Sequence, residues 1–170
     1  MTARLATPSD AASIARIYNE GIQDRVATFE TRLRAAEEVA AWFDGTHPIV
    51  VVERDGGVVG FADTSAYRPG RECYAGVAEF NVYVDRAHRG QGVGREVMAA
   101  LIGASEAAGL WKLLSRVFTD NAASRGLLRS VGFAEVGVYR RHARLDGVWR
   151  DVVIVERLLG DAADDSPGST

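Results

Sequence analysis

A glycine-rich segment, RGQGVG at residues 89–94, stands between a run typical of a strand and a run typical of a helix. This order predicts an anion site, because exposed backbone N–H groups and the positive end of the helix dipole both favour phosphate. The glycines let the backbone approach a ligand closely and adopt positive φ. Basic residues around the loop are candidates for further phosphate contacts; they are Arg86, His88, Arg89 and Arg95.

Two common phosphate-binding motifs do not fit this loop. A Walker loop ends in Gly-Lys-Ser/Thr, whereas here Gly94 is followed by Arg95 and Glu96. The dinucleotide fingerprint fails because Arg95 occupies the position of its third glycine. The loop alone therefore leaves two interpretations open: an anion site, and a glycine turn that merely starts a helix.

Glu79 is the candidate general base. It lies in a predicted strand over 74–84, where alternation puts it on one face with Val77, Asn81 and Tyr83. An unpaired Glu is seldom buried, and partial burial disfavours its charged form and so favours proton uptake. The alternative is a Glu on a solvated sheet face, which antiparallel sheets commonly have.

The rest of the chain supplies the elements that position these groups. We expect strands at 3–6, 74–84 and 111–118, hairpins over 49–68 and 134–158, and helices from Thr7 to about 22 and over 32–43, 92–108 and 122–131. The resulting order, β-α-α-β-β-β-α-β-α-β-β, predicts an α/β (mixed α+β) fold with a twisted mixed sheet flanked by helices. Strand 74–84, its helix and strand 111–118 are expected to form a right-handed crossover.

Length and composition restrict the function classes. We expect one domain over 1–160 and a disordered polar tail over 161–170. A net charge of −3 argues against a nucleic-acid partner. The single cysteine permits no internal disulfide, and neither a signal peptide nor a membrane span is evident. We therefore predict a cytoplasmic protein with no membrane partner, and, because the histidines lack ligand spacing, no metal.

Five segments, in this order, resemble the GNAT N-acetyltransferase superfamily and, within it, the phosphinothricin/methionine-sulfone acetyltransferase branch. They are TFETRL (28–33), RECYAGVAEFNVYV (71–84), VYVDRAHRGQGVGREVMAALI (82–102), TDNAASRGLLRSVGF (119–133) and DGVWRDVVIVERLL (146–159). The superfamily signature Arg/Gln-x-x-Gly-x-Gly/Ala is matched by Arg89 to Gly94. The resemblance runs from about residue 3 to residue 159 and implies that the domain over 1–160 is an N-acetyltransferase.

The resemblance implies acetyl-CoA as the acetyl donor. Its pyrophosphate would rest on the loop amides of Arg89, Gly90, Gln91, Gly92, Val93, Gly94 and Arg95, and its pantetheine arm would pair with the backbone of Val82, Tyr83 and Val84. Asn121 and Ser124 would contact the same arm, although Asn121 is equally suited to a plain helix cap, and both roles can coexist. In this branch a Glu at the position of Glu79 is the proposed base.

The resemblance also implies the acceptor. It would be the α-amine of a small amino acid or an amino-acid-like toxin: phosphinothricin, methionine sulfone or sulfoximine, or an arsenic-containing analogue. Arg71, in the family's Arg-x-x-Tyr pattern with Tyr74, would bind the carboxylate, and Phe29, Phe80 and Asn81 would shape the pocket. Acetylation of a toxin would confer antibiotic or herbicide resistance. Members of the branch often form homodimers, in which Trp149 could wall the partner's site.

One residue departs from the pattern. Family members usually have His or Tyr at the position of Leu128, and Leu can neither accept nor donate a proton. Water, Tyr139, His142 or the CoA thiolate itself would then complete the reaction. Two alternatives therefore stay open: a non-catalytic CoA-binding or sensor module, and an acetyltransferase for a protein N-terminus or a polyamine, against which Arg71 argues.

Overall fold

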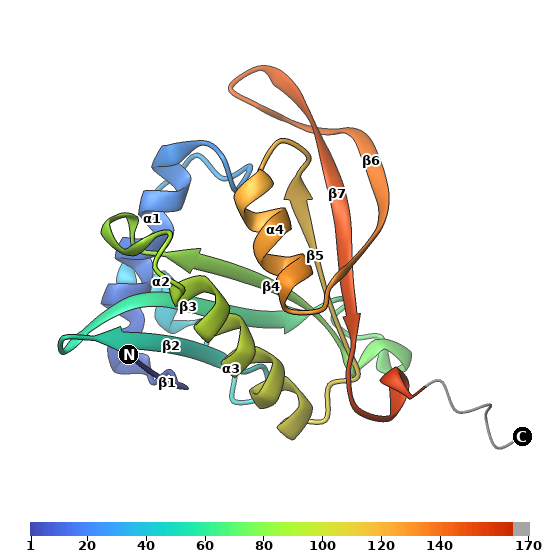
Figure 1. The fold of residues 1–170 in the computed structure, drawn as a ribbon, viewed down its shortest axis with the longest axis horizontal. Coiled ribbons are helices and arrows are strands. Elements are labelled where there is room, and N and C mark those ends of the chain that lie inside the picture. Colours follow the sequence, from blue (N-terminus) through green and yellow to red (C-terminus); the bar gives the residue numbers. More distant parts are fainter. Residues whose placement is uncertain (165–170) are drawn as a thin grey trace, which may run out of the picture.

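The computed structural model describes residues 1–164, which form one seven-stranded mixed sheet in the order β1-β2-β3-β4-β5-β7-β6 (Figure 1). The strands are β1 Thr2–Leu5, β2 Ile49–Arg54, β3 Gly57–Ala66, β4 Val77–Val84, β5 Lys112–Phe118, β6 Ala134–Leu145 and β7 Val148–Leu158. Neighbouring strands are antiparallel except β4 and β5, which are parallel. The predicted fold class and element order are confirmed.

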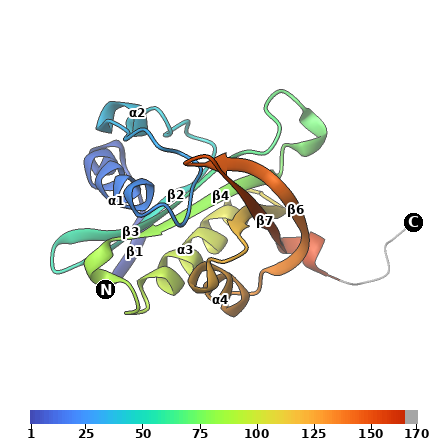
Figure 2. The same cartoon turned by 90° about the horizontal axis from the view of Figure 1, so that it is seen from above.

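Helices cover both faces of the sheet. Figure 2 shows α1 (Ala11–Asp24) and α2 (Ala36–Ala40) on one face and α3 (Val93–Ala107) and α4 (Ala122–Ser130) on the other. One apolar core cluster includes Val97, Met98 and Leu101 of α3, and a second includes Ile14, Ile17 and Tyr18 of α1. Each helix therefore packs through one apolar stripe, as the helical spacing predicts.

The predicted second helix, 32–43, is wrong in extent, because α2 has only five residues. The side-chain amide of Asn19 accepts from the backbone N–H of Arg34 at 2.8 Å and donates to its carbonyl at 2.9 Å. These bonds occupy backbone groups that a longer helix would use, and Ala35 before the helix is extended. A tertiary contact from α1 thus overrides the local helix pattern.

Short 3-10 turns account for the other differences from the predicted boundaries. They lie at Pro8–Asp10 before α1, Glu72–Tyr74 before β4, Arg86–His88 before α3, and Gly160–Ala163 after β7. Strand β4 therefore begins at Val77 rather than at 74. The tail predicted to be disordered begins inside the last of these turns, and residues 165–170 lie outside the described residues.

Strands β4 and β5 stay together for only a short distance. Val77, Ala78 and Glu79 pair with Lys112, Leu113 and Leu114, and within residues 1–164 no β4–β5 pair follows. The C-terminal half of β4 keeps its pairing with β3 on its other side. On the β5 side, the backbone groups of residues 80–84 therefore face a gap between the two strands.

Gly21 in α1 allows this helix to lie against β4. A Cβ at Gly21 would come within 2.5 Å of Cε1 and 2.6 Å of Cδ1 of Tyr83. The Tyr83 ring is buried, stacks on Phe61 at 5.6 Å and meets Tyr18 edge-on at 5.0 Å, so it has little room to move.

Gly21→Ala is therefore expected to lower the free energy of unfolding by about 1–3 kcal/mol through overpacking, measured by urea denaturation. Gly103→Ala in α3 is the matched control, since nothing lies within 4 Å of a Cβ there. It should be neutral or stabilising by up to about 1 kcal/mol. Equal stabilities of the two variants would contradict the packing argument.

Candidate active site

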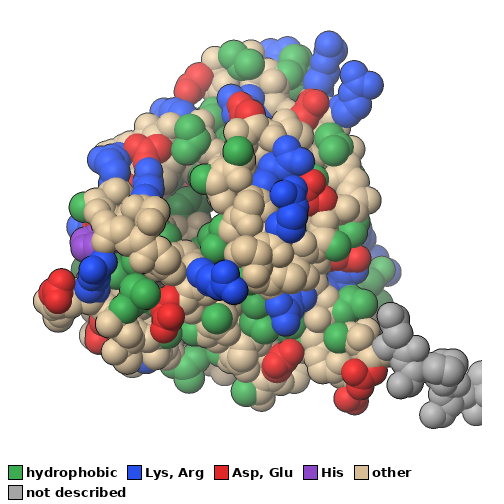
Figure 3. All heavy atoms as spheres, viewed as in Figure 1, with side chains coloured by type: hydrophobic (Ala, Val, Ile, Leu, Met, Phe, Trp, Pro, Cys, Tyr) green, Lys and Arg blue, Asp and Glu red, His purple; other side chains and the backbone are tan. Residues whose placement is uncertain are grey.

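A cleft of about 380 Å³ opens where α1, the end of β4, the glycine loop and α4 meet. Figure 3 shows it as a hollow with basic side chains beside it. Its lining residues are Gly21, Asp24, Val26, Ala27, Val82, Tyr83, Val84, Arg89, Gly90, Gly92, Gly94, Arg95, Asn121, Ala123, Ser124 and Leu127. All the predicted cofactor residues are among them except Gln91 and Val93.

The side chains of these two residues have structural roles, while the contacts expected from their backbone amides stay predictions. The Gln91 side chain accepts from Arg54 at 2.5 Å and donates to the Ala87 carbonyl at 3.0 Å, which draws it away from the cleft. Val93 is fully buried in the core below Gly60. The alternation of glycine and side chains in the loop thus places glycines at the cleft and the intervening side chains elsewhere.

The loop glycines do two different jobs. Gly90 and Gly92 have φ of 72° and 86°, and a Cβ on either would meet nothing within 4 Å. They form the left-handed turn that aims backbone at the cleft, and α3 begins directly after them. Gly94 lies within the helix, where a Cβ would come within 2.9 Å of Leu127, so it permits α3 and α4 to pack closely.

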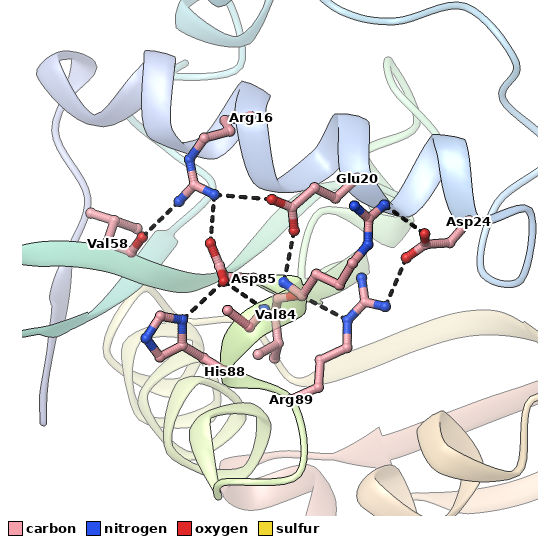
Figure 4. Close-up of polar contacts among 10 residues, drawn as sticks. Arg16, Glu20, Asp24, Val58, Val84, Asp85, His88 and Arg89 are labelled. Carbon is pink, nitrogen blue, oxygen red and sulfur yellow. Dashed lines mark hydrogen bonds and ion pairs between the residues drawn. The ribbon is translucent and has the colours of Figure 1, made fainter.

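Charged side chains of α1 hold the segment leading into the loop. Arg16, Glu20 and Asp24 recur at every fourth position and so share one face of the helix. Asp24 lies 2.7 Å from both Arg86 and Arg89, and Glu20 accepts from the backbone N–H of Arg86 at 2.7 Å (Figure 4). These arginines lower the pKa of Asp24, although its burial opposes the shift.

Asp85 anchors the same segment from below (Figure 4). It accepts from Arg16 at 2.5 Å, from the backbone N–H of Ala87 at 2.9 Å, and lies 2.9 Å from Nδ1 of His88. Burial would raise the pKa of Asp85, but these partners lower it to about 2. Arg86 and His88, predicted as phosphate contacts, are therefore engaged in the scaffold, whereas Arg89 and Arg95 line the cleft.

Glu79 lies on the α1 face of β4, on the side predicted from strand alternation. Its side chain is 29% exposed and its carboxylate accepts a hydrogen bond from Arg116 of β5 at 2.8 Å. The parallel register places Glu79 opposite Leu114. Arg116 is two residues further along β5, so its side chain is on the same face of the sheet as Glu79. The sequence reasoning missed Arg116 because strand register is a tertiary property.

A second, smaller cavity of about 40 Å³ lies in the gap between β4 and β5. It shares Ala27, Val82, Tyr83, Asn121 and Ser124 with the larger cleft, and is further lined by Phe80, Asn81, Ser115, Arg116, Val117 and Leu128. The two cavities therefore adjoin, and Arg116 and Asn81 bring the Glu79 face of the sheet to the smaller one. Leu128 is buried in its wall.

The predicted acceptor residues separate into distinct environments. Phe29 packs edge-on against Phe118 at 4.9 Å and contacts His142 at 6.4 Å between ring centroids. Phe80 is a core residue on the opposite face of β4 from Asn81, packed on Phe133 at 4.9 Å, although it contributes to the wall of the small cavity.

Arg71 and Tyr74 lie on the exposed turn before β4 and line neither cavity. In that turn it is Arg68 that lies over aromatic rings, 5.5 Å from Tyr67 and 5.9 Å from Tyr74. Asn121 caps α4 by accepting from the Ser124 N–H at 3.1 Å, and its amide donates to the Val26 carbonyl at 3.0 Å.

A buried carboxylate escaped the sequence reasoning. Asp63 of β3 is 6% exposed and lies directly opposite Asn81, whose Nδ2 donates to its Oδ2 at 3.1 Å. Burial raises the pKa of Asp63 to about 6, although the Asn81 bond opposes the shift.

The sequence reasoning also missed three residues of the cleft wall, Gly21, Asp24 and Ala27. The one signal that pointed to this wall is an isolated glycine inside an amphipathic helix.

The sequence profile of the acetyltransferase (GNAT) family matches residues 14–133. The fold and the site define the same class, and the chain belongs to the GNAT acetyltransferase family. A phosphinothricin N-acetyltransferase from Alcaligenes faecalis is 35% identical over 93% of this chain and 82% of that protein. The predicted resemblance to the phosphinothricin branch is thus confirmed, and the chain is an N-acetyltransferase.

Solved structures extend the likeness. A GNAT superfamily phosphinothricin acetyltransferase from Sinorhizobium meliloti, in complex with AcCoA, has a TM-score of 0.87 at 30% identity, covering 98% of this chain and 92% of its own. A ribosomal-protein-alanine N-acetyltransferase from Brucella melitensis has a TM-score of 0.88 at 31% identity, covering 94% and 100%.

Within residues 1–164, no helix is both long and apolar enough to span a bilayer. The same residues contain no group of three or more side chains suited to hold a metal ion.

Asp63→Asn is expected to raise the free energy of unfolding at pH 8 by about 1–3 kcal/mol. Because the folded-state pKa is raised, Asp63 stabilises the fold fully only below its ordinary value of 3.8, and this contribution is lost as pH rises through about 6. The gain of the variant over wild type should therefore vanish near pH 4. Urea denaturation of both proteins at pH 4, 6 and 8 measures it, and a pH-independent difference would contradict the assignment to burial.

Proposed function

We propose that this protein transfers the acetyl group of acetyl-CoA to the α-amine of a small amino acid or amino-acid-like toxin, with Glu79 as general base. The observation that carries the proposal is the continuity of the site. A cleft floored by a glycine loop at a helix N-terminus runs along β4 to a small cavity beside Glu79 and Arg116.

The donor fits the cleft. Gly90 and Gly92 present open backbone at the N-terminus of α3, which suits a diphosphate. Arg95 lines the same cleft and adds positive charge. The strand edge of Val82–Val84 has no β5 partner in the described sheet, so its backbone groups can pair with the amides of a pantetheine arm.

The acceptor side requires proton removal. An amine is mostly protonated at neutral pH, so one proton must leave before its nitrogen attacks the thioester carbonyl. In the proposed reaction Glu79 takes that proton, directly or through water, the C–N bond forms, and the C–S bond breaks. After the attack the nitrogen loses a second proton, to the departing sulfur or to water, and keeps its last proton as the amide N–H. The sulfur leaves as thiolate or thiol. Acetyl-CoA supplies the activated acyl group, and the chain supplies proximity, which can account for about 7–11 kcal/mol of the barrier.

Recognition of the acceptor is assigned to residues around Glu79. Asn81 lies on the same face of β4, and Phe29 covers the end of the neighbouring β5 through Phe118. Arg71 and Tyr74 lie in the turn that precedes β4, and in this proposal Arg71 binds the acceptor carboxylate as that turn folds over the bound molecule. Arg71→Ala would then raise the KM for the acceptor, and an unchanged KM would remove Arg71 from the site.

Leu128 leaves the protonation of the leaving sulfur to another group. Tyr139 and His142 stack at 5.0 Å on the β6–β7 hairpin, and His142 lies beside Phe29, so this pair borders the acceptor side. A thiol of ordinary pKa near 8.5 also leaves tolerably as an anion. Either route is compatible with an apolar residue at 128.

Two other functions remain as competitors. The Brucella melitensis neighbour favours a protein N-terminal amine as acceptor, and Leu128 favours a CoA-binding module without catalysis. Glu79, ion-paired with Arg116 of the small cavity, argues against a CoA-binding module without catalysis. A polyamine would meet the Arg71 and Arg68 turn with like charge, which disfavours it.

Assembly and location are proposals as well. The β6–β7 hairpin exposes the apolar side chains of Val136, Val138, Tyr139, Val148 and Trp149, which supports a homodimer through this surface. The resemblance to amino-acid acetyltransferases supports a cytoplasmic enzyme that detoxifies its acceptor.

Donor binding is tested by calorimetry. Gly92→Ala should weaken acetyl-CoA binding at least about tenfold, because a side chain disfavours the left-handed turn that aims the loop amides. Gly109→Ala is the matched control: Gly109 has φ of 79° and open space, but lies beyond the opposite end of α3. Equal affinities of the two variants, or no binding of acetyl-CoA to wild type at millimolar concentration, would refute the donor assignment.

Catalysis is tested by thiol release with a panel of acceptors: phosphinothricin, methionine sulfone, methionine sulfoximine, an N-terminal alanine peptide and spermidine. Glu79→Gln should lower kcat with the best acceptor at least about tenfold at neutral pH. Glu156→Gln is the matched control, since Glu156 is also 29% exposed and ion-paired across strands, with Lys112. Near-normal turnover of Glu79→Gln would exclude the base, and a peptide preference would exclude the small acceptor.

A further inference from the structure

Asp63 is a buried carboxylate without a charged partner. Its Oδ2 accepts from Asn81, and its Oδ1 is buried without a hydrogen-bond partner among the described residues. Burying such a group is unfavourable, and natural cores rarely keep one without a use. The reaction as proposed above assigns it none.

The surroundings of Asp63 are chiefly aromatic and aliphatic. Ile49 is opposite it on β2, and Phe61 lies two residues away on the same face of β3. Tyr18 from α1 and Tyr83 from β4 face it, and its charge contributes to raising the pKa of both phenols after burial, the larger cause. The charge of Glu30, in the loop after α1, also raises the pKa of both phenols. Among the residues that the structure describes, no arginine or lysine is paired with Asp63.

The carboxylate dictates how Asn81 is turned. An ionised carboxylate only accepts hydrogen bonds, so the Asn81 amide must direct its NH₂ group toward Asp63. The carbonyl oxygen of the same amide then points away from Asp63. Asn81 is exposed and lines the small cavity, and within residues 1–164 its Oδ1 has no hydrogen-bond donor.

The Asn81 oxygen and the Glu79 carboxylate belong to the same face of β4. Glu79 and Asn81 are two residues apart on one face of β4, which corresponds to about 7 Å along a strand. A group placed between them meets a carboxylate and a carbonyl oxygen, two acceptors of N–H bonds. A primary ammonium, with three N–H donors, satisfies both, whereas a hydroxyl or a tertiary amine satisfies at most one.

We propose that Asp63 is a positioning residue that holds the carbonyl oxygen of Asn81 toward the acceptor, where it and Glu79 together select a primary amine over a hydroxyl or a tertiary amine. This inference deepens the proposed function and rests on it. The raised pKa of Asp63 is consistent with the assignment, because at neutral pH the ionised, acceptor-only form prevails. Below pH 6 a protonated Asp63 can donate to the amide oxygen and release Asn81 to turn.

The test is a double-mutant cycle with the best primary-amine acceptor of the panel. Asp63→Leu should raise the KM for the acceptor at least about tenfold, the loss expected when a hydrogen bond to a charged group is removed, and leave the KM for acetyl-CoA unchanged. In an Asn81→Ala background the same substitution should change the acceptor KM less than about twofold, because the group it positions is gone. Asp63→Asn, which can still accept from Asn81, should stay within about threefold of wild type.

Controls separate this role from stability. Ile49→Ala perturbs the strand beside Asp63 without touching the acceptor side, and should lower the free energy of unfolding without raising the acceptor KM. If Asp63→Leu does not fold, side-chain amide NMR of wild type decides instead. The Asn81 NH₂ signals, assigned with Asn81→Ala, should shift near pH 6 and shift again on saturation with acceptor.

Each outcome is decisive. The positioning role would be overturned if Asp63→Leu raised the acceptor KM equally in both backgrounds, or if the Asn81 amide signals did not shift on addition of the acceptor. Either result would leave the N-acetyltransferase proposal intact. A wild-type enzyme that prefers a tertiary amine or an alcohol would overturn the selection of primary amines. Failure of wild type to acetylate any member of the panel would overturn both proposals together.

Discussion

Strand β4 pairs with its parallel neighbour β5 from Val77 to Glu79 and then diverges from it. Backbone groups inside a sheet must find partners, so a strand edge left open in the interior persists only where something else can pair with it. Both cavities lie along this opening. The glycine loop that follows β4 and the start of α4 line the larger cavity. Glu79 is the last residue of β4 paired with β5 before the opening, although it lines neither cavity itself.

Most charged side chains near this opening are paired with one another and hold the backbone in place. The Arg16, Glu20 and Asp24 face of α1 engages the segment before the glycine loop, and Asp85 completes that network. Its arginines and carboxylates largely neutralise one another, so this network adds little net charge beside the cleft. This agrees with a net charge of −3. Asp63 is the exception: within residues 1–164 this buried carboxylate has no cation beside it, and its burial lowers stability.

Features of the fold and site that arise from neighbouring residues could be predicted from the sequence. Features that depend on tertiary contacts could not. Strand alternation placed Glu79 and Asn81 on one face, and the glycine loop was correctly placed directly before a helix, because both are local patterns. The anion site at this loop stays a prediction. The short α2 was not predictable, since Asn19 reaches Arg34 only in the folded chain. The Glu79–Arg116 pair requires the parallel register, which no local pattern encodes. Asp63 had a signal, a carboxylate on the inward face of an apolar strand beside Phe61, but its meaning depends on the register with Asn81.

The same distinction between local and tertiary information bears on Leu128. In the proposed reaction a proton donor at this position would act on the leaving sulfur, whereas Leu128 contributes only apolar surface to the small cavity. The wall also contains Asn121 and Ser124, at the N-terminus of α4, where the helix dipole is positive. In the proposed reaction this dipole can stabilise a departing thiolate without transferring a proton to it. The absence of an acid at position 128 is therefore compatible with turnover.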